Sequence, residues 1–114
     1  MNELIIITKI KKTILYFNNI LDNFPKKEVI LKSNIEKTLY SILENIYRAN
    51  YIDKRIEFLY KTLVQIKMMD FYLKILLEKK IINYKKFIII CNYFNEITKM
   101  LYGMINNEKK KYKI

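Results

Sequence analysis

Apolar residues recur at steps of three and four positions along four long segments of this chain, and this spacing constrains the fold most. Side chains at such steps lie on one face of an α-helix. The four stripes are Ile7, Ile10, Ile14, Phe17, Leu21 and Phe24; Leu31, Ile35, Leu39, Ile42, Ile46 and Ala49; Ile56, Leu59, Leu63, Ile66, Leu73 and Leu77, interrupted at Asp70; and Phe87, Ile90, Phe94, Ile97, Leu101 and Met104. The spacing predicts amphipathic helices over residues 2–22, 29–50, 53–79 and 84–106.

Glycine and proline are nearly absent, with one of each in 114 residues. A β-sheet protein needs many tight turns, which use these residues, whereas long helices with short connections need few. Connections of about three to eight residues make consecutive helices antiparallel. We therefore expect an all-α fold, an antiparallel up-down-up-down four-helix bundle over residues 1–107, followed by a basic flexible tail at 108–114.

Local signals mark where the later helices begin. The second helix has two candidate starts, a capping box at Ser33-x-x-Glu36 or a start near Lys27. Asp53 and Asn83 are the predicted N-caps of the third and fourth helices, because short polar side chains accept hydrogen bonds from the first turn.

The formal net charge is +11, from 22 basic and 11 acidic residues. Such a charge favours a polyanionic partner, either nucleic acid or an anionic membrane surface. An A+T-rich codon bias would also enrich lysine, which leaves open that the lysines have no function. The same codon bias also favours aspartate and glutamate, so it does not by itself explain why basic residues outnumber acidic ones two to one.

The chain lacks the residues that most catalytic sites require. It has no histidine, the commonest general base and metal ligand. Its one cysteine, Cys91, excludes an intrachain disulfide, fits a reducing compartment, and is expected to be a buried structural thiol. The carboxylates of Glu36, Glu44, Glu57 and Asp70 are better explained by solvated faces or salt bridges than by a metal site. We expect no enzyme activity and no cofactor.

The longest stretches without charge, residues 13–21 and 87–95, have nine residues each, whereas a membrane-spanning helix needs about 20. Residues 1–10 do not follow the pattern of a signal peptide. We expect a soluble, cytoplasmic protein that does not bind membranes.

Further apolar and aromatic residues lie beside or outside the stripes: Ile5, Ile6, Leu15, Tyr16, Tyr40, Leu43, Phe58, Tyr60, Phe71, Tyr72, Ile88, Ile89 and Tyr93. Exposed apolar patches usually mark interfaces, so this surplus predicts a homo-oligomer. The alternative is that tyrosine tolerates solvent and that codon bias places isoleucine on surfaces.

The candidate nucleic-acid interface consists of lysines. Lys54, Lys61 and Lys79 fall on one side of the third helix, away from its stripe. The predicted contacts are Lys26, Lys27, Lys54, Lys61, Lys79, Lys109, Lys110, Lys111 and Lys113. Lysines bind phosphates as point charges and do not read bases, so we expect sequence-independent binding of RNA and DNA.

Several short motifs from Phe24 onward match a known pattern. They are Phe24-Pro25-Lys26, Leu31 and Ile35, Ser41-Ile42-x-x-Asn45-Ile46, Ala49-Asn50, and Asn95-Glu96-Ile97-x-Lys99-Met100-Leu101-x-Gly103. The last is similar to an E-I-G-[KR]-M-L-G-G-W signature, with Thr98, Tyr102 and Met104 at the two glycine positions and the tryptophan position. On these motifs the chain resembles the four-helix-bundle family of the accessory variability determinant of diversity-generating retroelements. Proteins encoded in intervening sequences of 23S ribosomal RNA belong to the same superfamily.

The resemblance implies a homopentameric barrel of four-helix bundles that is basic, binds RNA and DNA, and associates with the retroelement reverse transcriptase. Such a protein supports mutagenic copying of template RNA into cDNA without catalysing it. The alternative is a bundle of the ribosomal-intervening-sequence type, acting as a structural or protein-interaction module that does not bind nucleic acid.

Overall fold

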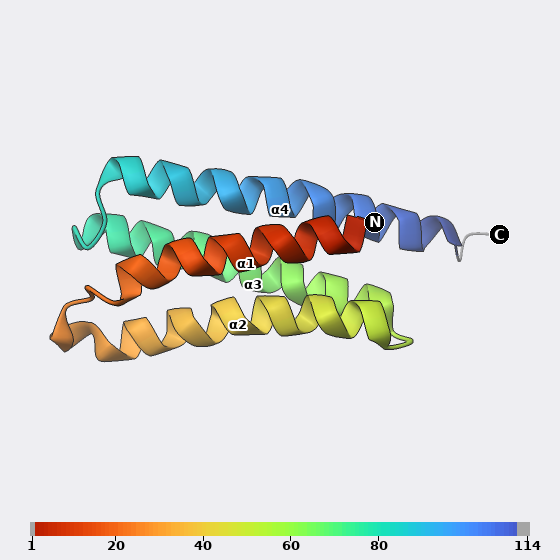
Figure 1. Cartoon of the computed structure of the whole chain (residues 1–114), viewed down its shortest axis with the longest axis horizontal. Helices are drawn as coiled ribbons and strands as arrows, with labels where there is room; N and C mark the ends of the chain where they lie inside the picture. The colour runs from red at the N-terminus through yellow and green to blue at the C-terminus, as the bar shows by residue number, and fades with distance from the viewer. Residues whose placement is uncertain (1, 112–114) are drawn as a thin grey trace.

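The computed structural model describes the backbone of residues 2–111 and the side chains of residues 5–111 (Figure 1). Its elements are helix α1 (Asn2–Leu21), the 3-10 turn η1 (Lys26–Glu28), and helices α2 (Val29–Tyr51), α3 (Arg55–Glu78) and α4 (Tyr84–Lys111). Residues 2–111 contain no strand. The predicted all-α four-helix fold is confirmed, and the first three helices end within two residues of the expected positions.

The helices lie at the corners of an elongated bundle that measures 52 × 23 × 20 Å. Both α1 and α3 pack against α2 and α4, so α1 and α3 lie diagonally opposite each other. The α1–α2 and α3–α4 connections lie together at one end of the bundle (Figure 1). We call it the double-turn end. The α2–α3 connection and the end of α4 lie at the other, the C-terminal end.

The predicted stripes of α1, α2 and α4 supply most of the core, although Phe24, Leu31 and Phe87 are only half-buried against it. Phe17, Ile35, Ile46, Phe94 and Ile97 are among its completely or almost completely buried side chains. Such burial of large apolar side chains contributes about 1.5–3 kcal/mol each to folding. One residue expected outside the stripes is also in the core: Ile6 is fully buried, because α1 buries adjacent positions where it meets two neighbours.

The predicted stripe of α3 is only partly correct: Leu59, Ile66 and Leu73 are buried as expected, whereas Ile56 is half-buried. The buried residues are Leu59, Thr62, Ile66, Met69, Leu73 and Leu76. Leu63 and Leu77, which we expected in the core, are only half-buried. Met69 occupies the position that Asp70 was expected to interrupt, so the stripe has no gap. The error arises because Leu63 and Leu77 lie at the flank of the buried face, where they keep the three-four spacing but are not turned fully inward.

The predicted starts of α2 and α3 need correction. Helix α2 begins at Val29, directly after η1, so the alternative start near Lys27 is the better one and the capping box at Ser33–Glu36 is wrong. Asp53 is not the N-cap of α3: Lys54 occupies that position and no side chain caps the helix. Arg55 begins the helix, and its side chain is engaged elsewhere, as described below.

Helix α3 ends in a left-handed residue. Lys80 has φ 62°, and the amide of Ile81 donates to the Leu76 carbonyl at 2.9 Å while that of Lys80 donates to the Leu77 carbonyl at 3.0 Å. This pair of hydrogen bonds is the Schellman motif, which satisfies the last carbonyls of a helix. Glycine usually occupies the left-handed position, and here it is lysine.

Helix α4 begins as predicted and ends later than predicted. The side-chain oxygen of Asn83 accepts a hydrogen bond from the Lys86 amide at 2.8 Å, which confirms the N-cap. The helix continues to Lys111, five residues past the expected end at 106. Residues 108–111 are therefore helical and not part of a flexible tail, because Glu108 is buried in a polar contact with α3.

Candidate nucleic-acid interface

The structure divides the predicted lysines between the two ends of the bundle. Lys26, Lys27 and Lys79 lie at the double-turn end, whereas Lys54, Lys61 and residues 109–111 lie at the C-terminal end (Figure 1). Although Lys61 and Lys79 share one side of α3, 18 residues separate them, which is about 27 Å along the helix. The predicted residues therefore form two basic ends instead of one patch. Lys113 lies outside the described residues.

At the double-turn end, an ion pair holds the two connections together. The ammonium of Lys79, at the end of α3, lies 2.9 Å from a carboxylate oxygen of Glu28 in η1. Lys26 and Lys27 are exposed on the same 3-10 turn, and no described carboxylate pairs with either. These two ammonium groups are thus available to an external anion, whereas that of Lys79 is partly neutralised.

Three lysines at this end were missed in the sequence. Lys80 follows α3, and Lys85 and Lys86 lie in the first turn of α4; all three are exposed. That first turn holds no acidic residue, so the lysines add to the positive end of the helix dipole. The predicted topology could have pointed to these lysines, because an up-down-up-down bundle brings its first and third connections to the same end.

At the C-terminal end, aromatic rings support two of the predicted lysines. The ammonium of Lys61 lies 3.5 Å from Glu57 and 4.9 Å from the centre of the Phe58 ring. The ammonium of Lys109, on α4, lies 5.8 Å from the centre of the Tyr60 ring on α3. Cation–π contacts at exposed sites contribute about 0.5–1 kcal/mol, so these lysines are partly ordered before any ligand binds.

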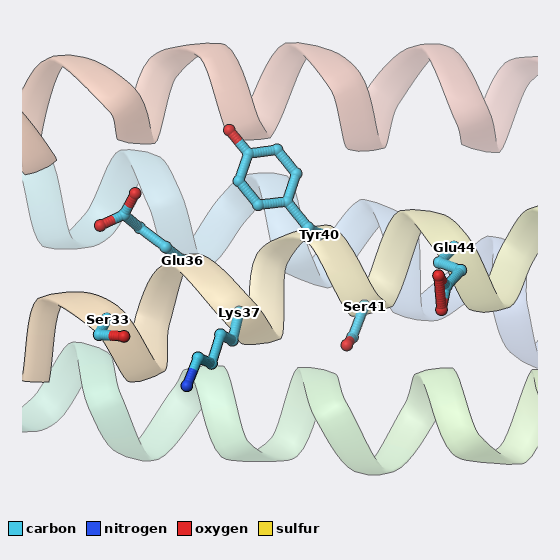
Figure 2. A pocket seen from close by; sticks show the side chains of 6 residues that line it. All are labelled: Ser33, Glu36, Lys37, Tyr40, Ser41 and Glu44. Atoms are coloured by element: carbon cyan, nitrogen blue, oxygen red, sulfur yellow. The ribbon is translucent and has the colours of Figure 1, made fainter. Parts of the chain in front are cut away.

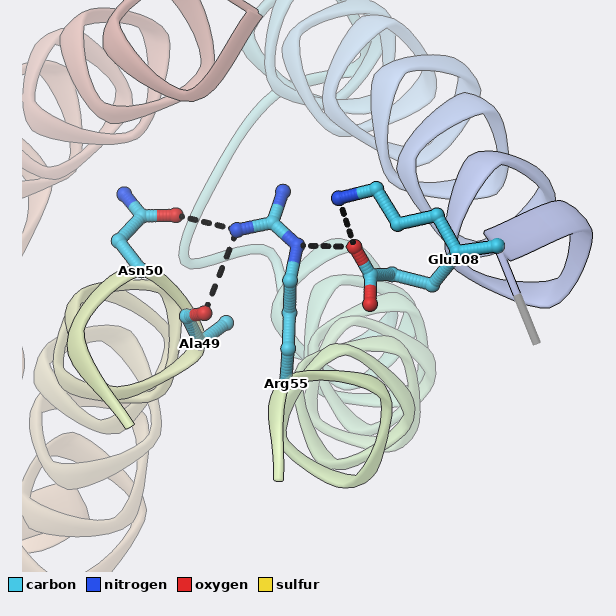
Figure 3. Close-up of polar contacts among 5 residues, drawn as sticks. Ala49, Asn50, Arg55 and Glu108 are labelled. Carbon is cyan, nitrogen blue, oxygen red and sulfur yellow. Dashed lines mark hydrogen bonds and ion pairs between the residues drawn. The ribbon is translucent and has the colours of Figure 1, made fainter. Parts of the chain in front are cut away.

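A buried polar cluster joins α2, α3 and α4 at the same end (Figure 3). The Nε of Arg55 lies 3.0 Å from Oε1 of Glu108, and its Nη1 donates to the Ala49 carbonyl at 3.3 Å and to Asn50 at 3.1 Å. Lys111 also contacts Glu108, at 3.1 Å. The side chain of Glu108 is 5% exposed and that of Arg55 19%. The cluster fixes the end of the bundle, and Arg55 serves the fold.

The remaining reactive groups with described side chains are the thiol of Cys91 and the carboxylates. Burial raises the pKa of the half-buried Cys91 thiol, the nearby Asp70 carboxylate raises it further, and Lys74 opposes them. The thiol is therefore protonated at neutral pH. Among residues whose side chains are described, no three acidic or thiol groups cluster as metal ligands. None of the described helices has an apolar stretch long enough to cross a membrane.

The carboxylates of α2 border an open hollow on the outer surface of that helix (Figure 2). Its volume is about 600 Å³, and its lining residues are Ser33, Glu36, Lys37, Tyr40, Ser41 and Glu44. All six belong to one helix and face solvent, so the hollow does not enclose a small molecule. Glu36 and Tyr40 extend from α2 toward α1.

The chain is similar to a known family and to proteins of known structure. A family model described as bAvd-like matches residues 4–108. A crystal structure of a protein of unknown function from the S23 ribosomal protein family of Bacteroides thetaiotaomicron has a TM-score of 0.82 to this chain at 23% sequence identity, covering 93% of this chain and 99% of the other. At this identity the likeness concerns the fold. No curated protein matches the chain.

Proposed function

The chain belongs to the bAvd-like family, and on that basis we propose that it is a non-catalytic, nucleic-acid-binding accessory protein. In this role it assists a retroelement reverse transcriptase in mutagenic cDNA synthesis from template RNA. It binds RNA and DNA without sequence preference and acts as a cytoplasmic homo-oligomer, with the pentamer as the expected state.

The observation that carries this proposal is the concentration of lysine at the double-turn end. Six exposed lysines gather there from two connections: Lys26, Lys27, Lys79, Lys80, Lys85 and Lys86. Among the described residues of these connections, the acidic ones are Asp22, Glu28 and Glu78. A surface with this excess of ammonium groups attracts phosphates and releases their counterions, which is the main source of sequence-independent affinity.

The residue inventory supports a role without catalysis. The chain has no histidine, and its cysteine is protonated at neutral pH because burial raises the thiol pKa. Chemistry on the nucleic acid would then belong to the polymerase partner. The accessory protein would hold the template, and several copies of a modest basic surface would raise its effective concentration at the polymerase.

Fluorescence anisotropy with a labelled RNA at 50–200 mM salt tests the proposal. With five to ten phosphates engaged by the assembly, affinity should fall about a thousandfold or more across this range. Lys26→Gln with Lys27→Gln should weaken binding to every sequence equally and flatten the salt dependence. The control, Lys37→Gln with Lys99→Gln, removes the same charge from exposed positions away from both ends and should change affinity much less.

A second pair of substitutions, Lys54→Gln and Lys61→Gln, measures what the C-terminal end contributes. We expect a smaller loss there, because Lys61 is already paired with Glu57. Absence of binding at 50 mM salt, or equal losses in the test and control variants, would leave the lysines without a role in nucleic-acid binding.

The alternative is a protein-interaction module that does not bind nucleic acid. Ion pairs that engage Lys61, Lys79 and Lys111 within the bundle favour it. The same titration separates the two functions, since the alternative predicts no affinity for RNA at low salt.

A further inference from the structure

The first residue of α4, Tyr84, has an aromatic side chain that the fold leaves open to water. It lies at the double-turn end and is 66% exposed. The preceding residue, Asn83, caps the helix through its side-chain oxygen. Neither the core nor the cap of α4 therefore requires an aromatic residue at this position. A single exposed tyrosine is common on protein surfaces, but the surroundings of this one are specific.

A neighbouring aromatic side chain supports the Tyr84 ring. The centres of the Tyr84 and Phe87 rings are 6.1 Å apart and their planes meet at 29°, which is a stacked arrangement. Phe87 is half-buried and packs against the core, so it is a fixed support. The face of the Tyr84 ring that is turned away from Phe87 is open to a ligand. Because the ring is already positioned, stacking on it costs little conformational entropy.

Lysines surround Tyr84 in the sequence. Residues 79–95 include Lys79, Lys80, Lys85 and Lys86 and no acidic residue. The last three of these lysines are exposed and form no ion pair with a described carboxylate. The open aromatic ring thus lies within the basic surface of the double-turn end.

Tyr84 faces the boundary between α4 and α3. Seven residues separate it from Cys91, which places the two side chains within about 20° of each other around α4. Cys91 lies near α3, because the charges of Asp70 and Lys74 on that helix shift the pKa of its thiol in opposite directions. Lys74 is exposed. The ammonium groups near Tyr84 therefore come from α3 as well as from α4.

This combination of an aromatic ring and lysines suits a nucleic acid with unpaired bases. Lysines attract the phosphates of any nucleic acid, and on their own they favour a duplex, because its higher charge density releases more counterions. An aromatic side chain stacks on the face of a base. Inside a duplex both faces of a base are covered by its neighbours, whereas a single strand can turn a base outward. The ring therefore adds a preference that lysines lack.

We propose that the double-turn end binds single-stranded RNA in preference to duplex RNA, with a base stacked on Tyr84 and the adjoining phosphates held by Lys80, Lys85 and Lys86. This inference rests on the proposed function and specifies the form of nucleic acid that the basic surface takes. A template held as a single strand is in the form that a reverse transcriptase copies.

Fluorescence anisotropy with an oligouridylate and with an RNA duplex of the same number of phosphates tests the preference at 50 mM salt. Wild type should bind the single strand more tightly, the reverse of what lysines alone predict. Tyr84→Ala should weaken binding of the oligouridylate by about fivefold or more and leave the affinity for the duplex unchanged. Tyr84→Phe should behave as wild type, because the ring face makes the contact.

The matched control is Tyr40→Ala. Tyr40 is 53% exposed and lies in the middle of α2 on a surface that also carries Glu36 and Glu44 (Figure 2). Its removal should not change the affinity for either RNA. Both tyrosines are exposed, so circular dichroism should show the same helical content in all variants.

A second measurement detects stacking directly. The chain has no tryptophan, so Tyr84→Trp introduces a single indole at the site. Stacking of a base on an indole quenches its fluorescence. Saturating oligouridylate should quench the Tyr84→Trp variant, and saturating duplex should not. The same substitution at the control position, Tyr40→Trp, should give no quenching with either RNA.

The two experiments separate failure of this inference from failure of the proposed function. Salt-dependent binding with equal or higher affinity for the duplex would overturn the single-strand preference and leave nucleic-acid binding standing. Wild-type affinity of Tyr84→Ala for the oligouridylate, or equal quenching of Tyr84→Trp by both RNAs, would show that no unpaired base stacks there. Absence of binding to both RNAs at 50 mM salt would refute the proposed function and this inference together.

Discussion

Glu108→Gln should destabilise the bundle far more than loss of a charge from its surface. The substitution keeps the size of the side chain and removes the charge that faces Arg55. The Glu108 side chain is 5% exposed and that of Arg55 19%, so water does not replace the lost partner. Breaking a buried pair by removing one charge costs about 3–5 kcal/mol.

We expect Glu108→Gln to lower the free energy of unfolding by about 3 kcal/mol, at the lower end of that range. The loss is limited because Ala49 and Asn50 continue to accept hydrogen bonds from Arg55. A chain of this size has a total stability of about 5–15 kcal/mol, so the loss is a large fraction of it. Urea denaturation followed by circular dichroism, at one fixed protein concentration, measures the difference.

The control is Glu57→Gln, which breaks the exposed pair with Lys61 and should cost under about 1 kcal/mol. A double variant, Arg55→Met with Glu108→Leu, removes both charges and should recover most of the stability, because apolar replacements of a buried pair are often neutral. If Glu108→Gln lowers the free energy of unfolding no more than Glu57→Gln does, the polar cluster does not stabilise the C-terminal end.

Three further predictions concern single side chains. Lys80→Gly should raise stability by about 0.5–1 kcal/mol, because glycine adopts the φ of 62° without strain; an unchanged urea midpoint would contradict this. Cys91 should react with a disulfide reagent at pH 8 more slowly than a free thiol, since burial raises its pKa, and Cys91→Ala should cost about 1 kcal/mol without changing RNA affinity. The hydrogen bond from Lys9 lowers the pKa of Glu96 below its ordinary value of 4.5, so its contribution to stability is present above pH 4.5 and is lost as pH falls through the lowered value. Lys9→Met should return the Glu96 pKa, followed by carbon NMR, toward 4.5.

Three of the four stripes could be predicted from the sequence because their helices are apolar on one face only. In α1, α2 and α4 the three-four spacing has a single solution. Helix α3 is less clear-cut, because Leu63 and Leu77 lie beside its buried face and a second apolar row, Tyr60, Val64, Met68 and Phe71, follows similar spacing on its exposed side. Thr62 is buried and Val64 is exposed, so hydrophobicity alone cannot choose between the faces. Only the neighbouring helices decide which face is inside.

The end of α4 was mispredicted for a different reason. Glu108 continues the stripe of Leu101 and Met104 at the same three-four spacing, but a glutamate is not expected at a core position. Its partner, Arg55, lies 53 positions earlier in the chain. A buried charge becomes intelligible only when the fold brings its counter-charge to it, and local sequence patterns carry no information about that contact.

The division of the lysines between two ends connects assembly with binding. If copies of the proposed homo-oligomer pack side by side, their sides are occupied and their ends stay open. In a closed ring every copy then presents its double-turn end on the same rim, so Lys26 and Lys27 recur around that rim. RNA binding should depend on the ring, because one copy offers too few phosphate contacts for a steep salt dependence. A variant that assembles poorly because an exposed apolar side chain of α3 is replaced by a charge, such as Phe71→Glu, should therefore bind RNA more weakly than wild type and with a shallower salt slope, although it keeps every lysine. If this variant retains the full slope, each copy binds RNA alone, and assembly serves another purpose.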